Sequence, residues 1–337
     1  MNAEARAVTE DEIAFFRHNG WVKLPALVSP DAAAEMLAEA KRLLGPTGAE
    51  HRGRDGLDVA FDWWNDYHYP SRQGVEPFRS LARSGAMGRN AQRMMGRPIA
   101  VRHFADMIGA RAPVGGGKDA ETTYHQDYPG GQFDRAGNVV FWIALNDMPP
   151  ERGVMRFVSG AHREGSLGYR PPDLFDRYPY LLDRYELSEP MHLSPGDATV
   201  HGQYTFHGSP ANTTDEPRWH FSTIYIPADM RWTGRTFHGR DLAQLEERGL
   251  FDDEAFPVIA DGDGVTPDDV ADLGWRVVGR GHQHGDAWSW DVVRANKVRR
   301  VRVVGAADAS DARQVIEARL GADEPPAELH APASPLD

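Results

Sequence analysis

The chain has 337 residues, 41% of them hydrophobic, which is enough for one large domain or two small ones. It contains no cysteine, which excludes disulfide bonds, thiolate metal sites and a cysteine nucleophile, so histidine or carboxylate side chains must hold any metal ion. The net charge of −13 disfavours nucleic-acid partners, and no apolar run approaches the roughly 18 residues of a membrane span. No signal peptide is visible, so we expect a cytoplasmic protein, and the sequence does not indicate its oligomeric state.

The start of the chain predicts two helices separated by a strand. Thr9 and Glu12 have the spacing of a capping box, and Gly20 is suited to end the helix that follows them. Residues 21–24 alternate as in a strand, and a proline at the start of residues 30–44 is typical of a helix. The apolar residues of these elements recur at helical and strand spacing, so we interpret them as core.

An aromatic-rich stretch, residues 61–69, lies within a turn-rich region and has two interpretations. It is either a small hydrophobic cluster under a long loop or the wall of a substrate site. In the second case Trp63 and Trp64 are candidate substrate contacts. A helix over residues 75–95 and a strand over residues 99–107 are predicted next.

The strongest chemical signal is a His-x-Asp triplet with a histidine far beyond it. His125 and Asp127 are two residues apart, so on a strand their side chains point to the same side. His207 lies 80 residues on (207 − 127 = 80), and two histidines with one carboxylate form the facial triad of non-haem Fe(II) enzymes. A second such triplet, residues 284–286, is followed only by a histidine in the proline-rich tail, so we interpret it as structural.

The remaining chain predicts short strands broken by glycine and proline. Residues 139–145 and 154–158 have the pattern of buried strands, and a tyrosine-rich insertion covers residues 164–190. The pattern then changes to a short helix over residues 242–249 and a strand over residues 298–304. Many short strands with such turns indicate a sandwich or a barrel.

Four segments of the chain resemble the phytanoyl-CoA dioxygenase-like branch of the Fe(II)/2-oxoglutarate-dependent dioxygenases. They read TEDEIAFFRHNGWVKLPALVSPDAAAEM, YHQD, VVFWIALNDMPPERGVMRFVSGAHREG and LSPGDATVHGQYTFHGSPANTTDEPRWHFSTIYIP, and they fall within residues 9 to 228. The resemblance implies a mainly β chain with flanking helices, folded as a double-stranded β-helix, which is the cupin-like jelly roll.

We therefore expect one dioxygenase domain over residues 1–320. It would contain N-terminal helices at about 9–110, a metal and cosubstrate core at about 120–228 and a C-terminal extension at about 230–320. The tail, residues 321–337, is rich in proline and is expected to be disordered.

The resemblance also implies the cofactors and the residues that hold them. His125, Asp127 and His207 would bind Fe(II), with 2-oxoglutarate and O2 as cosubstrates and succinate and carbon dioxide as products. Arg218 follows His207 at the family's spacing, and its guanidinium fork suits the far carboxylate of 2-oxoglutarate. Further candidates for contact with the cosubstrate are Ser209, Trp142 and Met107, although a core role fits Trp142 equally well.

Residues beside the ligands are candidate substrate contacts. Tyr124, Gln126 and Tyr128 flank the ligands His125 and Asp127 and would form part of the substrate wall. His201 lies six residues before His207, an even offset that places both on one face of a strand. It is a candidate for contact with the substrate or with a metal ligand, and a packed core histidine is the alternative.

We expect an oxygenase that hydroxylates a small, partly apolar metabolite, in secondary-metabolite biosynthesis. Desaturation, epimerisation and ring closure are related outcomes of the same chemistry. The alternative is a cupin-like metal-binding protein or isomerase that does not use 2-oxoglutarate and has no need of Arg218 and Ser209. Because halogenases of the family carry a small residue in place of the carboxylate, Asp127 indicates that no halide is incorporated.

Overall fold

The computed structural model describes residues 4–48, 64–97, 99–113, 121–127, 132–167, 174–235, 245, 247–251, 254–261, 276–294, 297–320 and 325–331. The chain divides into two compact units, one made of Met1–His162 with Gly168–Thr266 and one made of Arg163–Leu167 with Pro267–Asp337. In the described part of the chain, no helix is both long enough and apolar enough to cross a membrane.

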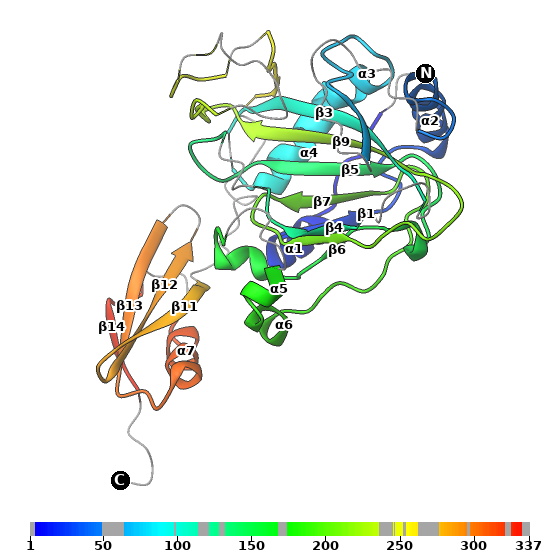
Figure 1. The fold of residues 1–337 in the computed structure, drawn as a ribbon. Helices are drawn as coiled ribbons and strands as arrows, with labels where there is room; N and C mark the ends of the chain where they lie inside the picture. Colours follow the sequence, from blue (N-terminus) through cyan, green and yellow to red (C-terminus); the bar gives the residue numbers. More distant parts are fainter. Residues whose placement is uncertain are drawn as a thin grey trace. The chain divides into compact units, whose positions relative to one another are not determined.

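The first unit is built on a seven-stranded antiparallel sheet (Figure 1). Its strands follow the order β1-β7-β5-β9-β3-β10, and β2 pairs with β3 beside this path. Their bounds are β1 Trp21–Leu24, β2 Trp64–His68, β3 Val101–Arg111, β5 Val139–Ala144, β7 Ala198–Gly202, β9 Arg218–Pro227 and β10 Val258–Ala260.

A smaller antiparallel sheet belongs to the same unit. It consists of β4 (Thr122–His125), β8 (His207–Ser209) and β6 (Arg156–Phe157), in the order β4-β8-β6. The connections around it contain short helices with these bounds: η2 Pro150–Arg152, η3 Ala161–Glu164, α5 Leu174–Arg177 and α6 Tyr180–Arg184. The predicted mainly β chain with flanking helices is confirmed.

Alternation along the strands separates two faces of the main sheet. On β9, Trp219, Phe221 and Tyr225 point to one face and join the largest hydrophobic core. Arg218 and His220, which alternate with them, point to the other face. One face is therefore apolar, and the other carries buried polar and charged groups.

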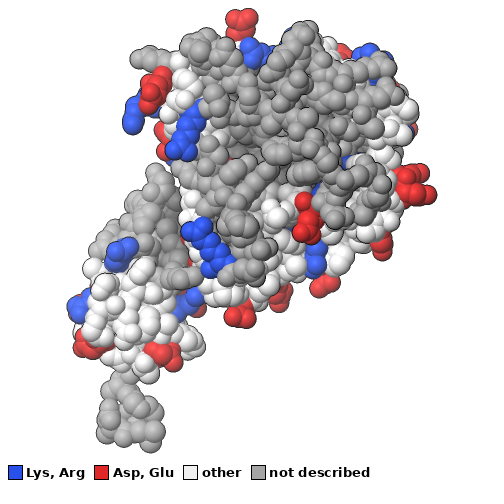
Figure 2. Space-filling model, in the orientation of Figure 1, with Lys and Arg blue, Asp and Glu red and all other residues white. Residues whose placement is uncertain are grey.

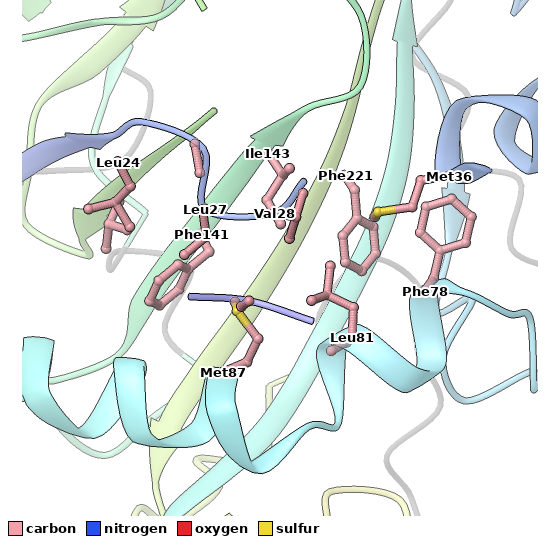
Figure 3. Close-up of a cluster of buried hydrophobic side chains, with 14 of the residues drawn as sticks. Leu24, Leu27, Val28, Met36, Phe78, Leu81, Met87, Phe141, Ile143 and Phe221 are labelled. Atoms are coloured by element: carbon pink, nitrogen blue, oxygen red, sulfur yellow. The ribbon is translucent and has the colours of Figure 1, made fainter. Parts of the chain in front are cut away.

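Helices cover the apolar face, and Figure 3 shows where they meet the sheet. Met36, Phe78 and Met87 lie against Phe141 of β5 and Phe221 of β9, and the rings of Phe78 and Phe221 are 4.9 Å apart. These three residues come from helices with the following bounds: α2 Pro30–Leu44, α3 Phe78–Ala82 and α4 Gly85–Met95.

Local capping decides where these helices begin and end. Helix α1 (Glu10–Asn19) has the predicted capping box between Thr9 and Glu12, and Gly20 ends it in the left-handed conformation. Residues 75–95, predicted as one helix, form α3 and α4, because the side chain of Ser84 caps a new helix start. Of the helix predicted at 242–249, residues 245 and 247–249 are described and are not helical.

The second unit has its own sheet and core. The strands follow the order β11-β12-β13-β14, and α7 (Ala309–Glu317) buries Ala312 and Ile316 against Trp290, Val301 and their neighbours. The strand bounds are β11 Arg276–His284, β12 Ala287–Arg294, β13 Lys297–Val304 and β14 Glu328–His330. Of the extension expected at about 230–320, residues up to 266 belong to the first unit, where β10 pairs with β3, and the residues from 267 onward belong to this second unit.

The end of the chain also differs from the expectation of a disordered tail over residues 321–337. Glu328–His330 form β14, which pairs in parallel with β13 through Arg302, Val303 and Val304. Leu329 is partly buried against the hydrophobic core of the second unit, and this burial offsets the entropy lost in ordering the segment. Residues 321–324 and 332–337 lie outside the described residues.

Acidic and basic side chains are interspersed on the face of the molecule seen in Figure 2. The net charge of −13 is therefore not gathered into one patch of the described residues on that face.

Candidate active site

Two histidines and one aspartate meet where the small sheet brings β4 and β8 together. His125 ends β4, His207 begins β8, and the two are partners in the antiparallel register. Their Nε2 atoms lie 3.6 and 3.8 Å from Oδ1 of Asp127, and one ligand atom from each of the three residues lies within 4.8 Å of the others. Three donors therefore surround one point, as a facial triad requires.

Both histidines are oriented so that the same nitrogen faces Asp127. Nδ1 of His125 donates a hydrogen bond to the carbonyl of Thr123 at 2.8 Å, and Nδ1 of His207 donates to the carbonyl of Thr205 at 3.0 Å. A carbonyl oxygen can only accept, so Nδ1 carries the proton and Nε2 keeps its lone pair. This is the tautomer of a metal ligand, and backbone carbonyls are common partners for the other nitrogen.

The protonation states of the cluster suit a divalent cation. Burial lowers the pKa of His207 well below its ordinary value, and His201 and His125 act in the same direction. Burial alone would raise the pKa of Asp127, but His207, His125 and His201 outweigh it and hold this pKa well below its ordinary value. His207 is thus a neutral imidazole and Asp127 an ionised carboxylate, the forms that bind metal ions.

The end of α1 supports the second histidine from a distant part of the sequence. The carbonyl of Gly20 accepts hydrogen bonds from Oγ1 of Thr205 at 2.6 Å and from the backbone of Gly202 at 3.1 Å. Thr205 is fully buried, and its own carbonyl is the one that orients His207. A Cβ at position 20 would lie 2.5 Å from Nδ1 of His162 and 2.9 Å from Oγ1 of Thr205, so this approach requires glycine.

Arg218 begins β9 on the polar face of the main sheet. Its side chain is 1% exposed and donates a hydrogen bond to the carbonyl of Gly153. The guanidinium carbon lies 5.3 Å from the ring centroid of Trp142, whose ring stacks on that of His220 at 4.6 Å and 16°. A buried cation framed by flat rings suits a carboxylate that binds out of water.

A second buried arginine, Arg111, was not singled out from the sequence. It ends β3, is the cross-strand partner of Arg218 and is fully buried. Its Nη1 donates to Oγ of Ser209 at 2.5 Å and to Oγ1 of Thr122 at 3.2 Å. Burial lowers the pKa of Arg111 to about 10, so it stays charged at neutral pH. The strand predicted to end at residue 107 continues to Arg111. Arg111 is an even number of residues from Met107, so on a longer strand the sequence would have placed both side chains on the same face.

The other predicted contacts fall in different places. Met107 lies on the polar face, opposite Ser222 in the register, and is half-buried. Tyr124 points to the side opposite His125, where its ring lies 4.8 Å from that of Phe175. Gln126 is fully buried and donates to a backbone carbonyl, that of residue 204, at 2.8 Å. Met107 therefore lies on the same face of the main sheet as Arg218, whereas Tyr124 points away from His125.

Of the remaining predicted substrate contacts, three have side chains outside the described residues, and His201 is described. Trp63 and Tyr128 lie outside the described residues, and the side chain of Trp64 at the start of β2 is not described either. His201 on β7 lies with its Nε2 3.2 Å from Oδ2 of Asp127. It thus belongs to the surroundings of the triad.

Known proteins similar to this chain share its architecture. The chain matches the model of the phytanoyl-CoA dioxygenase family over residues 16–219. A methylphosphonate hydroxylase from Gimesia maris is 26% identical over 261 residues, which cover 72% of this chain and 91% of that protein. The solved structure of SnoK, a non-haem α-ketoglutarate-dependent carbocyclase from nogalamycin biosynthesis, is 25% identical with a TM-score of 0.62, covering 75% of this chain and 96% of that chain.

A second solved structure carries cofactors. The epimerase SnoN, in complex with Fe3+, α-ketoglutarate and nogalamycin RO, is 26% identical with a TM-score of 0.61, covering 74% of this chain and 98% of that chain. These likenesses confirm the predicted jelly-roll fold and the predicted use of iron and 2-oxoglutarate. The family match ends at residue 219, before residues 267–337 of the second unit begin.

Proposed function

The chain belongs to the phytanoyl-CoA dioxygenase family, and from this premise we propose that it hydroxylates a small, partly apolar metabolite in secondary-metabolite biosynthesis. The observation that carries the proposal is the meeting of His125, Asp127 and His207 in metal-binding protonation states, in a fold whose polar sheet face holds the buried Arg218. Iron and 2-oxoglutarate are the cofactors of this family of enzymes, and the residues present fit both.

Each residue of the site has a distinct part. Nε2 of His125, Nε2 of His207 and Oδ1 of Asp127 would hold the iron ion. Arg218 binds the far carboxylate of 2-oxoglutarate through its guanidinium fork. Arg111 adds a second positive charge at the next strand and fixes the hydroxyl of Ser209, so that the cosubstrate enters an ordered, positively charged end of the sheet face.

The bound iron, with O2 and 2-oxoglutarate, supplies the oxidising power that converts 2-oxoglutarate to succinate and carbon dioxide and oxidises the substrate. The protein's contribution is to orient the bound groups and to exclude water from the site. Nε2 of His125 and Nε2 of His207 would donate lone pairs to the iron ion, while Asp127 supplies one negative charge. The ring of Trp142 lies against the guanidinium of Arg218 and is itself stacked on His220, and this low-polarity surface strengthens the attraction of Arg218 for a carboxylate.

The character of the substrate follows from the exposed part of the same face. Met107 of β3 and Ile224 of β9 are both half-buried there, whereas Arg111 and Arg218 are fully buried. Apolar side chains thus remain accessible while the cations are enclosed. This supports a partly apolar substrate next to a charged cosubstrate.

Hydroxylation is favoured because the similar protein from Gimesia maris is a hydroxylase. Epimerisation and ring closure are the second candidates, because the similar solved enzymes SnoN and SnoK are an epimerase and a carbocyclase. A cupin-like protein that does not use 2-oxoglutarate has no need of Arg218 and Ser209, and both are buried.

The test begins with anaerobic addition of 2-oxoglutarate to the Fe(II)-loaded protein, which should give a weak visible charge-transfer absorption. A panel of small, partly apolar compounds, with methylphosphonate included, is then screened for O2-dependent succinate formation. We expect one succinate for each product molecule and one oxygen atom added to that product. Absence of the absorption would refute 2-oxoglutarate use, and a product that gains no oxygen would move the assignment to epimerisation or ring closure.

A further inference from the structure

The two carboxylate oxygens of Asp127 have different surroundings. Oδ1 faces Nε2 of both His125 and His207, at 3.6 and 3.8 Å. Oδ2 lies 3.2 Å from Nε2 of a third histidine, His201. One oxygen is thus turned toward the ligand cluster and the other toward β7.

His201 is held firmly by its packing. It is 2% exposed, on the inner side of β7, and its ring centroid lies 4.3 Å from that of His207 and 5.8 Å from that of Phe157. Its Nδ1 has no hydrogen-bond partner among the described residues, so the contact with Asp127 is the one polar contact found for this ring. The ring therefore presents Nε2 to the carboxylate and to no other described group.

Asp127 has little else to fix its orientation. It lies two residues beyond His125, the last residue of β4, and its side chain is 32% exposed, so no strand pairing restrains it. The terminal torsion of an aspartate is broad, which lets the carboxylate turn and offer either oxygen, or both, to a metal ion. A hydrogen bond to one oxygen of a carboxylate is charge-assisted and strong enough to select one orientation.

We propose that His201 is a positioning residue that donates its Nε2 hydrogen to Oδ2 of Asp127 and so commits Oδ1 to the metal ion. This inference rests on the proposed metal site. An aspartate that binds through one oxygen occupies one coordination position, so 2-oxoglutarate and O2 keep the others. His201 is not a fourth ligand, because it does not belong to the group whose ligand atoms lie within 4.8 Å of one another.

Three variants separate the hydrogen bond from the packing. His201→Phe keeps a ring against His207 and Phe157 but cannot donate a hydrogen bond. His201→Gln keeps an N–H donor near the same position. His103→Phe is the matched control, because His103 is equally buried, on the opposite face of the main sheet, where it packs against Tyr225 at 5.9 Å.

The readouts are the Fe(II) dissociation constant, measured anaerobically against a competing chelator, and the position of the charge-transfer absorption with 2-oxoglutarate. His201→Phe should weaken Fe(II) binding by about 10- to 100-fold, the usual effect of removing a group that orients a ligand. It should also shift the absorption, because the carboxylate is free to change its binding mode. His201→Gln should restore most of the affinity and the wild-type absorption, and His103→Phe should leave both unchanged.

Wild-type affinity and absorption in His201→Phe would overturn the inference, and so would a Gln variant as weak as the Phe variant. If His201→Phe does not fold, His201→Met, which also cannot donate, repeats the comparison with His201→Gln. His207→Ala separates a failure of the role of His201 from a failure of the proposed metal site. Loss of iron in His207→Ala with full affinity in His201→Phe refutes only the role of His201, whereas iron retained by His207→Ala refutes the proposed metal site itself.

Discussion

Replacing Arg218 by alanine is expected to raise the dissociation constant of 2-oxoglutarate by about 30-fold or more, while iron still binds. Arg218 is 1% exposed and lies over Trp142, so the carboxylate it binds is largely removed from water. Leaving such a buried charge without its partner costs about 2–5 kcal/mol. At about 1.4 kcal/mol for each tenfold change, the lower limit corresponds to about 30-fold and the upper limit to more than about 1,000-fold.

The assay is an anaerobic titration of the Fe(II)-loaded protein with 2-oxoglutarate, followed by its charge-transfer absorption. Arg218→Lys keeps the charge but loses the planar fork, so its dissociation constant should fall between those of the wild type and the alanine variant. Arg102→Ala is the matched control. Arg102 is also a buried arginine, and it donates to the backbone carbonyls of Phe256 and Ala228 at the other end of β3.

An unchanged dissociation constant in Arg218→Ala, with a melting temperature near that of the wild type, would refute the reasoning. Arg111 is then the variant to compare, because it is the cross-strand partner of Arg218 and is equally buried. A large loss in Arg111→Ala alone would make Arg111 the anchor for the carboxylate.

His125→Ala and His207→Ala are expected to fold but to lose iron and turnover, and full iron content in both after gel filtration would contradict the metal site. Gly20→Ala, which places a Cβ 2.5 Å from a histidine nitrogen at a φ of +80°, should lower the unfolding free energy by about 1–3 kcal/mol in urea denaturation, and equal stability would show that the contact can relax. Burial, with the charges of two neighbouring arginines, lowers the pKa of His220 well below its ordinary 6.5, so below that pH the unfolded chain binds a proton that the folded protein excludes. This contribution to stability is present above pH 6.5 and is lost as the pH falls, by up to about 1.4 kcal/mol per pH unit, and His220→Gln should flatten the fall of the melting temperature between about pH 7 and 5.5. Because Asp127 supplies a third protein ligand, chloride should be neither required nor incorporated, and mass spectrometry showing a chlorinated product under labelled O2 would overturn this prediction.

The part of the site that the sequence predicts depends on local periodicity. His125 and Asp127 are an even number of residues apart, and the structure brings both to His207. The same rule places Tyr124 on the opposite side, because it is an odd number of residues from His125. Nearness in sequence to a ligand therefore does not by itself place a side chain on the same side as that ligand.

The parts that were missed depend on pairing between distant strands. Arg111 becomes a candidate for the site only when the register sets it opposite Arg218, and no local pattern specifies that register. The sequence did not predict the second unit as a separate compact unit for a similar reason. Valine and arginine are mixed along β13, and its valines join a core only after β11, β12 and β13 pair and α7 covers them.

The hydrogen bond from Thr205 to Gly20 joins residues 185 positions apart. Contacts between such distant segments form late in folding, because the chain must first lose the entropy of closing a long loop. The orientation of His207 is thus completed only when the start of the chain has met β7. During synthesis, most of the first unit must therefore leave the ribosome before His125, Asp127 and His207 can come together in their final orientation.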